Sequence, residues 1–486
     1  GAAVLTPHPL ISISAYNVNG LANGTPPLNV TSQMTITLSN DWWDALGVIA
    51  TLSTTDTNVT MLNASASYGD ILAATTEISP TPFKFSVKSA AGYNHPIPFK
   101  LVVQDTTGYV KTINFTVLTA SGVVSKSGRI SSNDTWTNNN TYLVTGTVIL
   151  DPGVTLTIQP GTTVKFNGGF GLTVGGTLVA DGTADQPIEF KSNTAAAWGS
   201  IQFGNPSTDA LADGSGHYLS GSILRHVNIT GTSSGIGCLT ATPYLVHLNF
   251  SGSIACTLGA TPIWFLDNII TGSASFTGPG AALRNVVSSG LSISGAGLAE
   301  DNIVTDTLSL GSGSARRNIA GGLTIGGSGG SLEDNTVFSN VNLGTSYTVT
   351  GNTIKGSLVA GDGATLDHNT VTKGITVGSS SSVTWNNVEN NSTTGLSAGT
   401  NVTAKYNRLI GGTTGMTATT GLIEHNIIAN NSGVGLQVGA ATVRYNTFTG
   451  NKGNTIQVQG GNPLAIEYNN LEGNKRMIFT RTSPAV

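Results

Sequence analysis

The chain has 486 residues and a formal net charge of −4, and only 9% of its residues are charged. This balance offers no basic surface for nucleic acid, and no apolar run reaches the length of a transmembrane span. Hydrophobic residues are moderately frequent and periodic, which excludes a disordered chain. Serine, threonine, asparagine and glycine dominate, a composition that favours an extracellular or cell-surface location.

Short alternating segments occupy the first 120 residues, among them 34–38, 83–87 and 99–103. About seven such segments, separated by turn-rich stretches, predict a β-sandwich over residues 1–120. The run from Asn58 to Ile71 resembles the Ig-like modules of secreted and surface-anchored prokaryotic proteins. That resemblance implies a spacer or interaction domain. Residues 121–142, rich in serine and glycine, are expected to connect this domain to the rest of the chain.

An asparagine recurs every 16 or 17 residues from Asn268 to Asn369 and about every 20 afterwards. A period of this length with alternating apolar residues predicts a β-solenoid, in which equivalent side chains stack in ladders. Each amide can donate to the next coil and accept from the previous one. The predicted asparagine ladder consists of Asn268, Asn285, Asn302, Asn318, Asn335, Asn352, Asn369, Asn387, Asn407, Asn426, Asn446 and Asn469.

Pairs of apolar residues separated by one small residue repeat in phase with the asparagines, as at Leu291 and Ile293 and at Leu308 and Leu310. Both members of a pair face the same side of a strand. The segment from Ile158 to Val164, followed by 176–183 and 198–201, resembles the opening of a right-handed parallel β-helix. That superfamily includes pectate lyases, tailspike depolymerases and many surface proteins. The resemblance implies an all-β chain with a right-handed parallel β-helix over residues 143–486.

Two cysteines, Cys238 and Cys256, occupy the same phase of the apolar ladder 18 residues apart. Stacked in adjacent coils, their sulfurs would lie within disulfide range. A disulfide and two buried free thiols are both compatible with this pattern.

Charged residues stand immediately before successive asparagines and alternate in sign: Asp267, Arg284, Asp301, Arg317 and Asp334. Alternating charges one coil apart predict a continuous ion-pair ladder. The alternative, a carboxylate cluster that binds sugar or calcium, would need acids that are not interleaved with arginines.

Candidate catalytic groups are scarce. Pectate-lyase-like enzymes use clustered aspartates for calcium and an arginine or lysine as base, and polygalacturonase-like hydrolases use aspartates on neighbouring coils. The solenoid sequence contains no Asp-Asp pair and no Asn-Thr-Asp run. A calcium site at glycine-rich loops, or a metal site built from histidines, competes with plain turn and ladder roles. The residues concerned are Asp181, Asp185, Asp209 and Asp213 for calcium, and His217, His226 and His247 for a metal.

Aromatic residues Tyr406, Tyr445 and Tyr468, with Trp385 and His425 nearby, are expected to form a packed stack, with stacking on sugar rings as the alternative. Glycosylation sequons are frequent and several fall in expected loops. The candidate sites are Asn29, Asn58, Asn63, Asn114, Asn133, Asn139, Asn249, Asn391 and Asn401.

These features favour a structural, non-enzymatic extracellular protein without a cofactor, which assembles head to tail through its chain ends into a filament, sheath or layer. Two alternatives remain: a monomeric adhesin or rod that binds surface glycans, and a polysaccharide lyase or hydrolase of the β-helix superfamily. No nucleic-acid partner and no membrane span are expected.

Overall fold

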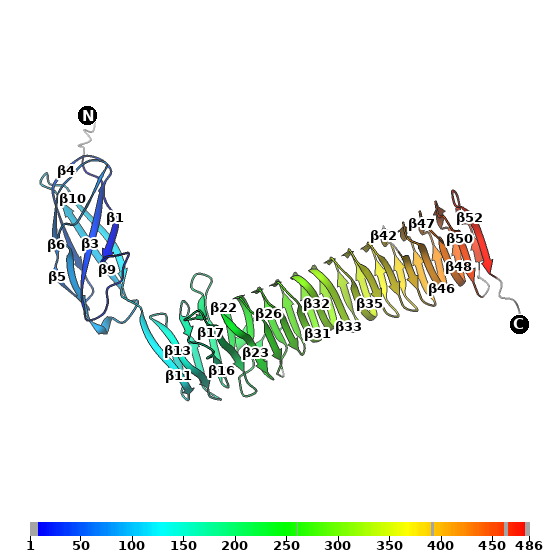
Figure 1. Ribbon diagram of the computed structural model, residues 1–486, viewed down its shortest axis with the longest axis horizontal. Helices are drawn as coiled ribbons and strands as arrows, with labels where there is room; N and C mark the ends of the chain where they lie inside the picture. Colours follow the sequence, from blue (N-terminus) through cyan, green and yellow to red (C-terminus); the bar gives the residue numbers. More distant parts are fainter. Residues whose placement is uncertain (1–7, 260, 390–392, 461–464, 482–486) are drawn as a thin grey trace. The chain divides into compact units, whose positions relative to one another are not determined.

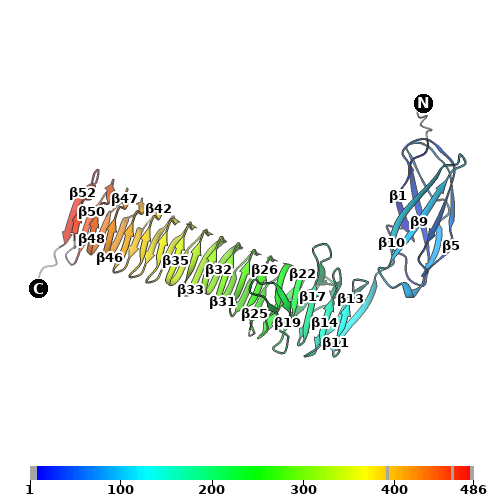
Figure 2. The same cartoon turned by 180° about the vertical axis from the view of Figure 1, so that it is seen from behind.

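The computed structural model describes residues 8–259, 261–389, 393–460 and 465–481. The chain divides into two compact units, Gly1–Ser125 with Trp136–Leu143 and Lys126–Thr135 with Val144–Val486. Strands make up both units (Figures 1 and 2). Within the described ranges there is no α-helix, hence no helix that could cross a membrane, and the one short 3₁₀ turn is η1 (Ser89–Ala91). The predicted all-β class is confirmed.

The first unit is a sandwich of two antiparallel sheets around one apolar core. One sheet has the order β2-β1-β3-β8-β5, with β7 beside β3, and the other has the order β10-β9-β4-β6. Ile36, Leu52, Phe85 and Leu101 are fully buried between them. The strands are β1 (Ile11–Val18), β2 (Leu21–Ala22), β3 (Thr31–Asn40), β4 (Ala45–Thr54), β5 (Val59–Asn63), β6 (Ser65–Ile71), β7 (Thr75–Ile78), β8 (Phe83–Val87), β9 (Pro96–Gln104) and β10 (Val110–Leu118).

The stretch expected to be a connection, residues 121–142, is itself folded. It contains β11 (Gly122–Ile130), β12 (Asp134–Trp136) and the start of β13 (Asn140–Leu150), which open the long sheet of the solenoid. Its serine- and glycine-rich composition concealed β11, in which Val123, Ser125, Ser127, Gly128 and Arg129 are exposed.

The second unit is a long parallel β-helix that runs from β11 to β52 (Arg476–Arg481) in one continuous sheet (Figure 1). The predicted apolar ladder is present: Leu291 pairs with Leu308, which pairs with Leu323. The strands used below are β17 (Thr177–Asp181), β22 (Ile223–Ile229), β23 (Thr232–Leu239), β24 (Tyr244–Phe250), β25 (Ile254–Thr257), β26 (Ile263–Leu266), β29 (Gly280–Leu283), β31 (Leu291–Glu300), β32 (Ile303–Arg316), β33 (Ile319–Glu333), β41 (Ser382–Thr384), β44 (Val402–Lys405), β45 (Arg408–Ile410), β46 (Thr414–Glu424) and β48 (Leu436–Arg444).

Cys238 on β23 and Cys256 on β25 are paired in register and joined by a disulfide between adjacent coils. Of the two alternatives that the sequence left open, the structure has the disulfide.

A buried asparagine ladder links the coils. The backbone N–H and the side-chain Nδ2 of Asn285 both donate to Oδ1 of Asn302, at 3.0 and 2.9 Å, and Nδ2 also donates to the carbonyl of Phe265 at 2.8 Å. The same pattern continues to Asn469, so each rung satisfies backbone groups that a turn would otherwise leave unpaired.

One predicted member of this ladder is wrong: the rung between Asn369 and Asn407 is Asn386, not Asn387. Asn387 is half-buried and its Oδ1 accepts a hydrogen bond from Nη1 of Arg408 at 3.0 Å. The spacing is 16 or 17 residues from Asn268 to Asn386 and then lengthens to 21, so the predicted step of 18 residues from Asn369 to Asn387 is one residue too long. A second, shorter ladder of Asn431, Asn451 and Asn474 was not predicted.

The residue before each rung, and the equivalent residue in the two coils before Asn268, turns the chain through a left-handed backbone conformation. From His226 to Tyr468 these corner residues have φ between 47° and 70°. For residues other than glycine this conformation costs roughly 1–2 kcal/mol, so contacts along the ladder must offset it. In chain order the corner row is His226, His247, Asp267, Arg284, Asp301, Arg317, Asp334, Gly351, His368, Trp385, Tyr406, His425, Tyr445 and Tyr468.

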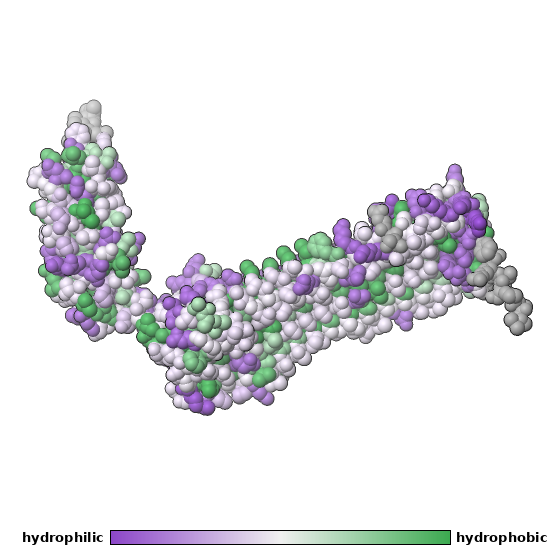
Figure 3. Space-filling view, viewed as in Figure 1, coloured by the Kyte–Doolittle hydropathy of each residue, from purple (hydrophilic) through white to green (hydrophobic). Residues whose placement is uncertain are grey.

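The residue after each rung faces outward, and in four successive coils it is apolar. Ile269, Val286, Ile303 and Ile319 pair in register and are 38–53% exposed. Figure 3 shows hydrophobic residues gathered along this edge of the solenoid. β-Branched side chains suit this position because it lies at the start of a strand.

Glu424, at the end of β46, is 5% exposed and holds cations from the coils on both sides. It contacts Nζ of Lys405 at 2.9 Å and also bonds Arg444. The hydrogen bond from Lys405, followed by that from Arg444, lowers the pKa of Glu424 against the opposing effect of burial.

Because the unfolded chain takes up a proton on Glu424 at higher pH than the folded one, we expect stability to fall as the pH drops below about 4.5. Glu424→Gln should lower the Tm at neutral pH, and its difference from the unsubstituted protein should shrink between pH 5 and 3. Thermal unfolding followed by circular dichroism across this range measures the difference. A difference that stays constant with pH would show that the carboxylate is not the titrating group.

Candidate functional site

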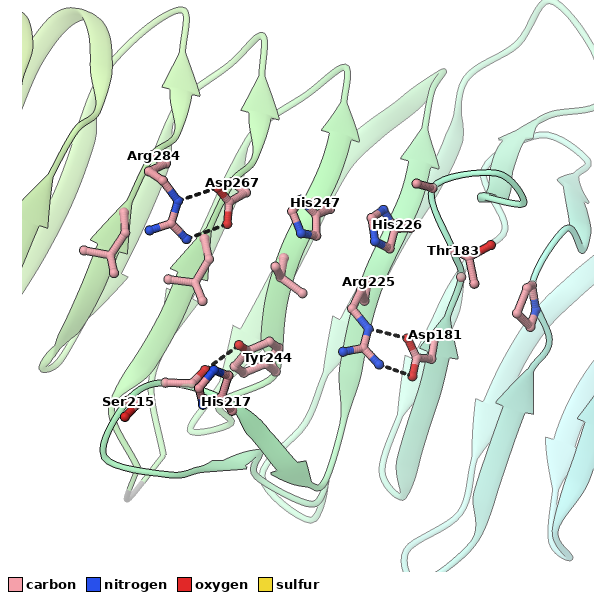
Figure 4. Close-up of a pocket in the computed structure, with 17 residues that line it drawn as sticks. Asp181, Thr183, Ser215, His217, Arg225, His226, Tyr244, His247, Asp267 and Arg284 are labelled. Atoms are coloured by element: carbon pink, nitrogen blue, oxygen red, sulfur yellow. Dashed lines mark hydrogen bonds and ion pairs between the residues drawn. The ribbon is translucent and has the colours of Figure 1, made fainter.

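A groove of about 690 Å³ opens on the outer surface of the early coils of the solenoid (Figure 4). Its floor and one wall come from consecutive coils, and the other wall comes from a hairpin at residues 211–220, directly before β22 in the chain. The lining side chains combine arginine, aspartate, histidine and tyrosine with an apolar floor.

The floor follows from the register of four parallel strands. Arg225 on β22 pairs with Val246 on β24, which pairs with Leu266 on β26 and then with Leu283 on β29. The corner residues come next in sequence, so His226, His247, Asp267 and Arg284 form a row above this floor (Figure 4).

The opposite wall is the hairpin of β20 (Leu211–Ala212) and β21 (Tyr218–Ser220). Asp213 holds its turn by accepting the backbone N–H groups of Ser215 and His217, at 2.8 and 2.9 Å. Both bonds lower the pKa of Asp213, and the bond from the His217 backbone has the larger effect. Tyr244, buried under the hairpin, donates its hydroxyl to the carbonyl of Gly216 at 2.5 Å, and burial raises its pKa.

Gly216, at the hairpin tip, must be a glycine. Its φ is +85°, and a Cβ there would lie 2.6 Å from the ring of Trp264. The hairpin is therefore fitted closely onto the solenoid surface and gives the groove a fixed wall.

Two aspartate–arginine pairs flank the groove. Nε and Nη2 of Arg225 each contact a carboxylate oxygen of Asp181 at 2.5 Å, and Arg284 holds Asp267 in the same way at 2.7 Å. Both oxygens of each aspartate are thus engaged. Across the described ranges, Nη1 of each arginine has no protein partner, so each guanidinium keeps a free edge for an anion.

His226 and His247 stack face to face, with ring centroids 4.4 Å apart and planes 9° apart. Burial lowers the pKa of His226, and repulsion by His247 and then by Arg225 adds to the effect, against the attraction of Asp181. His226 is therefore a neutral imidazole at neutral pH, with a nitrogen that can accept a proton.

The sequence-predicted calcium residues do not converge. Asp181 pairs with Arg225, Asp213 holds the hairpin, Asp209 accepts the backbone N–H of Thr242, and Asp185 lies exposed in a turn. No group of three or more His, Cys, Asp or Glu side chains with metal-site geometry occurs in the described part of the chain. His226 and His247 meet as a pair, while His217 lies on the hairpin.

The continuous ion-pair ladder is wrong. Asp267 pairs with Arg284, and Asp301 pairs with Arg317, but in the described coils no ion pair joins Arg284 to Asp301 or Arg317 to Asp334. The planar guanidinium of each arginine hydrogen-bonds both oxygens of the carboxylate in the preceding coil, as Arg284 does with Asp267. The result is two separate groups: the Asp267–Arg284 pair, and a cluster in which Arg317 contacts both Asp301 and Glu300 while Arg316 also binds Glu300. Exposed ion pairs of this kind contribute at most about 1 kcal/mol each.

The aromatic residues form a continuous stack along the corner row. His368, Trp385, Tyr406, His425, Tyr445 and Tyr468 have successive centroids 4.5–5.9 Å apart. Neighbouring rings cover the faces of the four inner rings and leave only their edges exposed. Because a sugar stacks on the face of a ring, this arrangement favours the packed stack over the sugar-binding stripe.

Of the sequons, Asn29, Asn114, Asn133, Asn139, Asn249 and Asn401 are exposed. Asn58 and Asn63 are half-buried, and Nδ2 of Asn63 is engaged with the carbonyl of Pro82 at 2.9 Å. Asn391 lies outside the described residues. Glycosylation stays a prediction, as do head-to-tail assembly and an extracellular location.

Comparison with known proteins bears on the first part of the solenoid. Residues 128–214 match the family model described as a pectate-lyase like beta helix domain. None of the curated proteins matches the sequence significantly.

Two structures of the catalytic domain of a GH87 alpha-1,3-glucanase, one with tetrasaccharides and one with nigerose, align over 97% of this chain and 98% of theirs. The identities are 11% and 8% and the TM-scores 0.20 and 0.18, so no residue role is transferred from them.

The family-model match, together with the groove, corrects the prediction of a structural protein without catalysis. The prediction depended on the absence of clustered acids in the sequence, yet the fold gathers arginine, histidine and aspartate from separate coils into one groove. Residues 128–214, which match the pectate-lyase like beta helix model, include Asp181 of the groove.

Proposed function

We propose that the protein is a polysaccharide lyase that cleaves uronate-containing chains in the groove between the corner row and the hairpin. The observation that carries the proposal is the stacked histidine pair beside two arginines that each keep a free Nη1. A base next to cationic donors is the arrangement that β-elimination next to a carboxylate requires.

The reaction assigns one task to each group. The free guanidinium edge of Arg225 binds the uronate carboxylate and stabilises the negative charge that develops when the C5 proton leaves. His226 accepts that proton on a ring nitrogen. The electron pair of the C5–H bond forms the C4–C5 double bond, the C4–O bond breaks, and the departing oxygen takes a proton from water.

Hydrolysis is less well supported by the same geometry. A glycosidase needs one carboxylic acid to protonate the leaving oxygen and a second carboxylate as nucleophile or base. Asp181 and Asp267 are the acids on the groove walls, and arginine occupies both oxygens of each.

We expect the protein to depolymerise polygalacturonate or alginate and to leave neutral glucans intact. The assay follows the ultraviolet absorbance of unsaturated uronate ends alongside the release of reducing ends. Elimination raises both signals together. Reducing ends without the absorbance would replace the proposal by hydrolysis, and no release from either polymer would overturn it.

A further inference from the structure

A second feature of interest lies on the sandwich: a loop that presents two adjacent tryptophans to solvent. Trp42 and Trp43, between β3 and β4, are 56% and 53% exposed. In the described structure neither indole nitrogen has a protein partner. Trp43 makes no ring contact there, and Trp42 makes only an edge contact with His8 at 6.4 Å. Large exposed aromatic groups of this kind mark binding surfaces.

The loop is held rigidly although the rings are free. Asn40 is fully buried, and its Nδ2 donates to the carbonyls of Trp43 and Ile71 at 2.7 and 2.9 Å. Its Oδ1 accepts the backbone N–H of Leu10 at 3.1 Å. Asp44 accepts the backbone N–H of Ala73 at 2.8 Å, which ties the far end of the loop to β6 and β7. A loop ordered in advance lowers the entropic cost of binding.

The loop itself carries two aspartates, Asp41 and Asp44, and no cationic residue. Two more aspartates lie beside the start of β4: Asp70 accepts the backbone N–H of Gly47, and Asp105 precedes Thr106, whose N–H donates to the carbonyl of Leu46. The first 83 residues contain no lysine or arginine. An anionic polymer would be repelled here, whereas carboxylates can accept hydrogen bonds from sugar hydroxyls.

We propose that the Trp42–Trp43 loop binds a neutral polysaccharide by stacking pyranose rings on the two indoles. β-Linked glucose and N-acetylglucosamine units expose flat C–H faces that match an indole in size and polarity. This site lies on a different unit from the lyase groove and takes a neutral rather than an anionic polymer, so its test is independent of the proposed activity.

The solenoid provides a matched control. Trp385 is also 53% exposed, but His368 and Tyr406 cover its two faces, with centroids at 5.9 and 4.5 Å. It therefore has the same exposure without an open face for a sugar.

The test measures retention of the full chain on microcrystalline cellulose and on chitin, with soluble polygalacturonate as the anionic comparison. We expect retention on at least one of the two solids, a loss of about tenfold for Trp42→Ala or Trp43→Ala, and no change for Trp385→Ala. Absence of retention on both solids, or equal retention by all three variants, would overturn the proposal.

A measurement on the unsubstituted protein guards against misfolded variants. Soluble cellopentaose or chitopentaose should protect Trp42 and Trp43, but not Trp385, from oxidation by N-bromosuccinimide, as read by peptide mass spectrometry. Equal oxidation of the two loop tryptophans with and without both oligosaccharides would exclude the site.

Discussion

Replacing Asn386 with alanine is expected to lower the free energy of unfolding by about 3–5 kcal/mol, whereas replacing its neighbour Asn387 should change it by less than about 1 kcal/mol. The measurements are denaturant unfolding of the full chain and hydrogen exchange of the coils that contain β41, β44 and β45. Exchange should accelerate in these coils for Asn386→Ala alone.

The contrast follows from the bonds that each side chain makes. The side chain of Asn386 is 1% exposed and donates to the carbonyls of Leu366 and Thr384 and to Oδ1 of Asn407. Its Oδ1 accepts both the backbone N–H and the Nδ2 of Asn369. Alanine would leave several of these buried groups without partners, and each such group costs roughly 1–3 kcal/mol. Because the turn can relax in part, we expect a total loss of about 3–5 kcal/mol in the free energy of unfolding, less than the sum of these separate costs.

Asn387 is the control because it has the same residue type and the next position in the chain. Among the described residues, its side chain hydrogen-bonds only Arg408 and Glu389, near the surface, where water can replace it. Equal losses for the two variants, or a larger loss for Asn387→Ala, would contradict the assignment of the rung and of the ladder as a source of stability.

The regular part of the fold could be predicted from sequence because equivalent residues recur at a nearly constant spacing, which identifies the stacked coils. Between Asn268 and Asn369 the spacing is 16 or 17 residues, and there every predicted rung lies in the ladder. At Asn386 and Asn387, just before a coil that takes extra residues, two adjacent asparagines could fill the rung, and the prediction chose the later one. Local hydrogen bonds, and not the average spacing, choose which asparagine turns inward.

The groove was missed because its parts are distant in sequence. Asp181 and Arg225 are 44 residues apart, and the hairpin between them interrupts the repeat. One signal was available: His226 and His247 each stand two residues before an asparagine, in the sequences His-Val-Asn and His-Leu-Asn. That pattern places both rings in one column of adjacent coils. It says nothing of the arginines beside them, whose free Nη1 atoms depend on side-chain geometry.

His226→Phe should reduce the rate of uronate elimination by about 10²–10⁴-fold while the protein stays folded. Phenylalanine keeps a ring to stack on His247 and removes the nitrogen that accepts the proton. The control is His368→Phe, at the same left-handed corner position with φ 53°, which lies outside the groove and should leave the rate unchanged. Loss of activity in His247→Phe but not in His226→Phe would show that His247, and not His226, is the base.

The pH profile separates a base from a structural ring. Burial and the neighbouring charges of His247 and Arg225 lower the pKa of His226 below its ordinary value of 6.5. The acidic limb of kcat/KM should therefore lie below pH 6.5, because the imidazole stays unprotonated until the pH reaches its lowered pKa. The same shift means that the unfolded chain binds this proton first, so His226 reduces stability as the pH falls from 6.5 towards that pKa. Asp181→Asn removes the one attraction that opposes the shift and should move the acidic limb further down; a limb that moves up would contradict the role of His226 as the base.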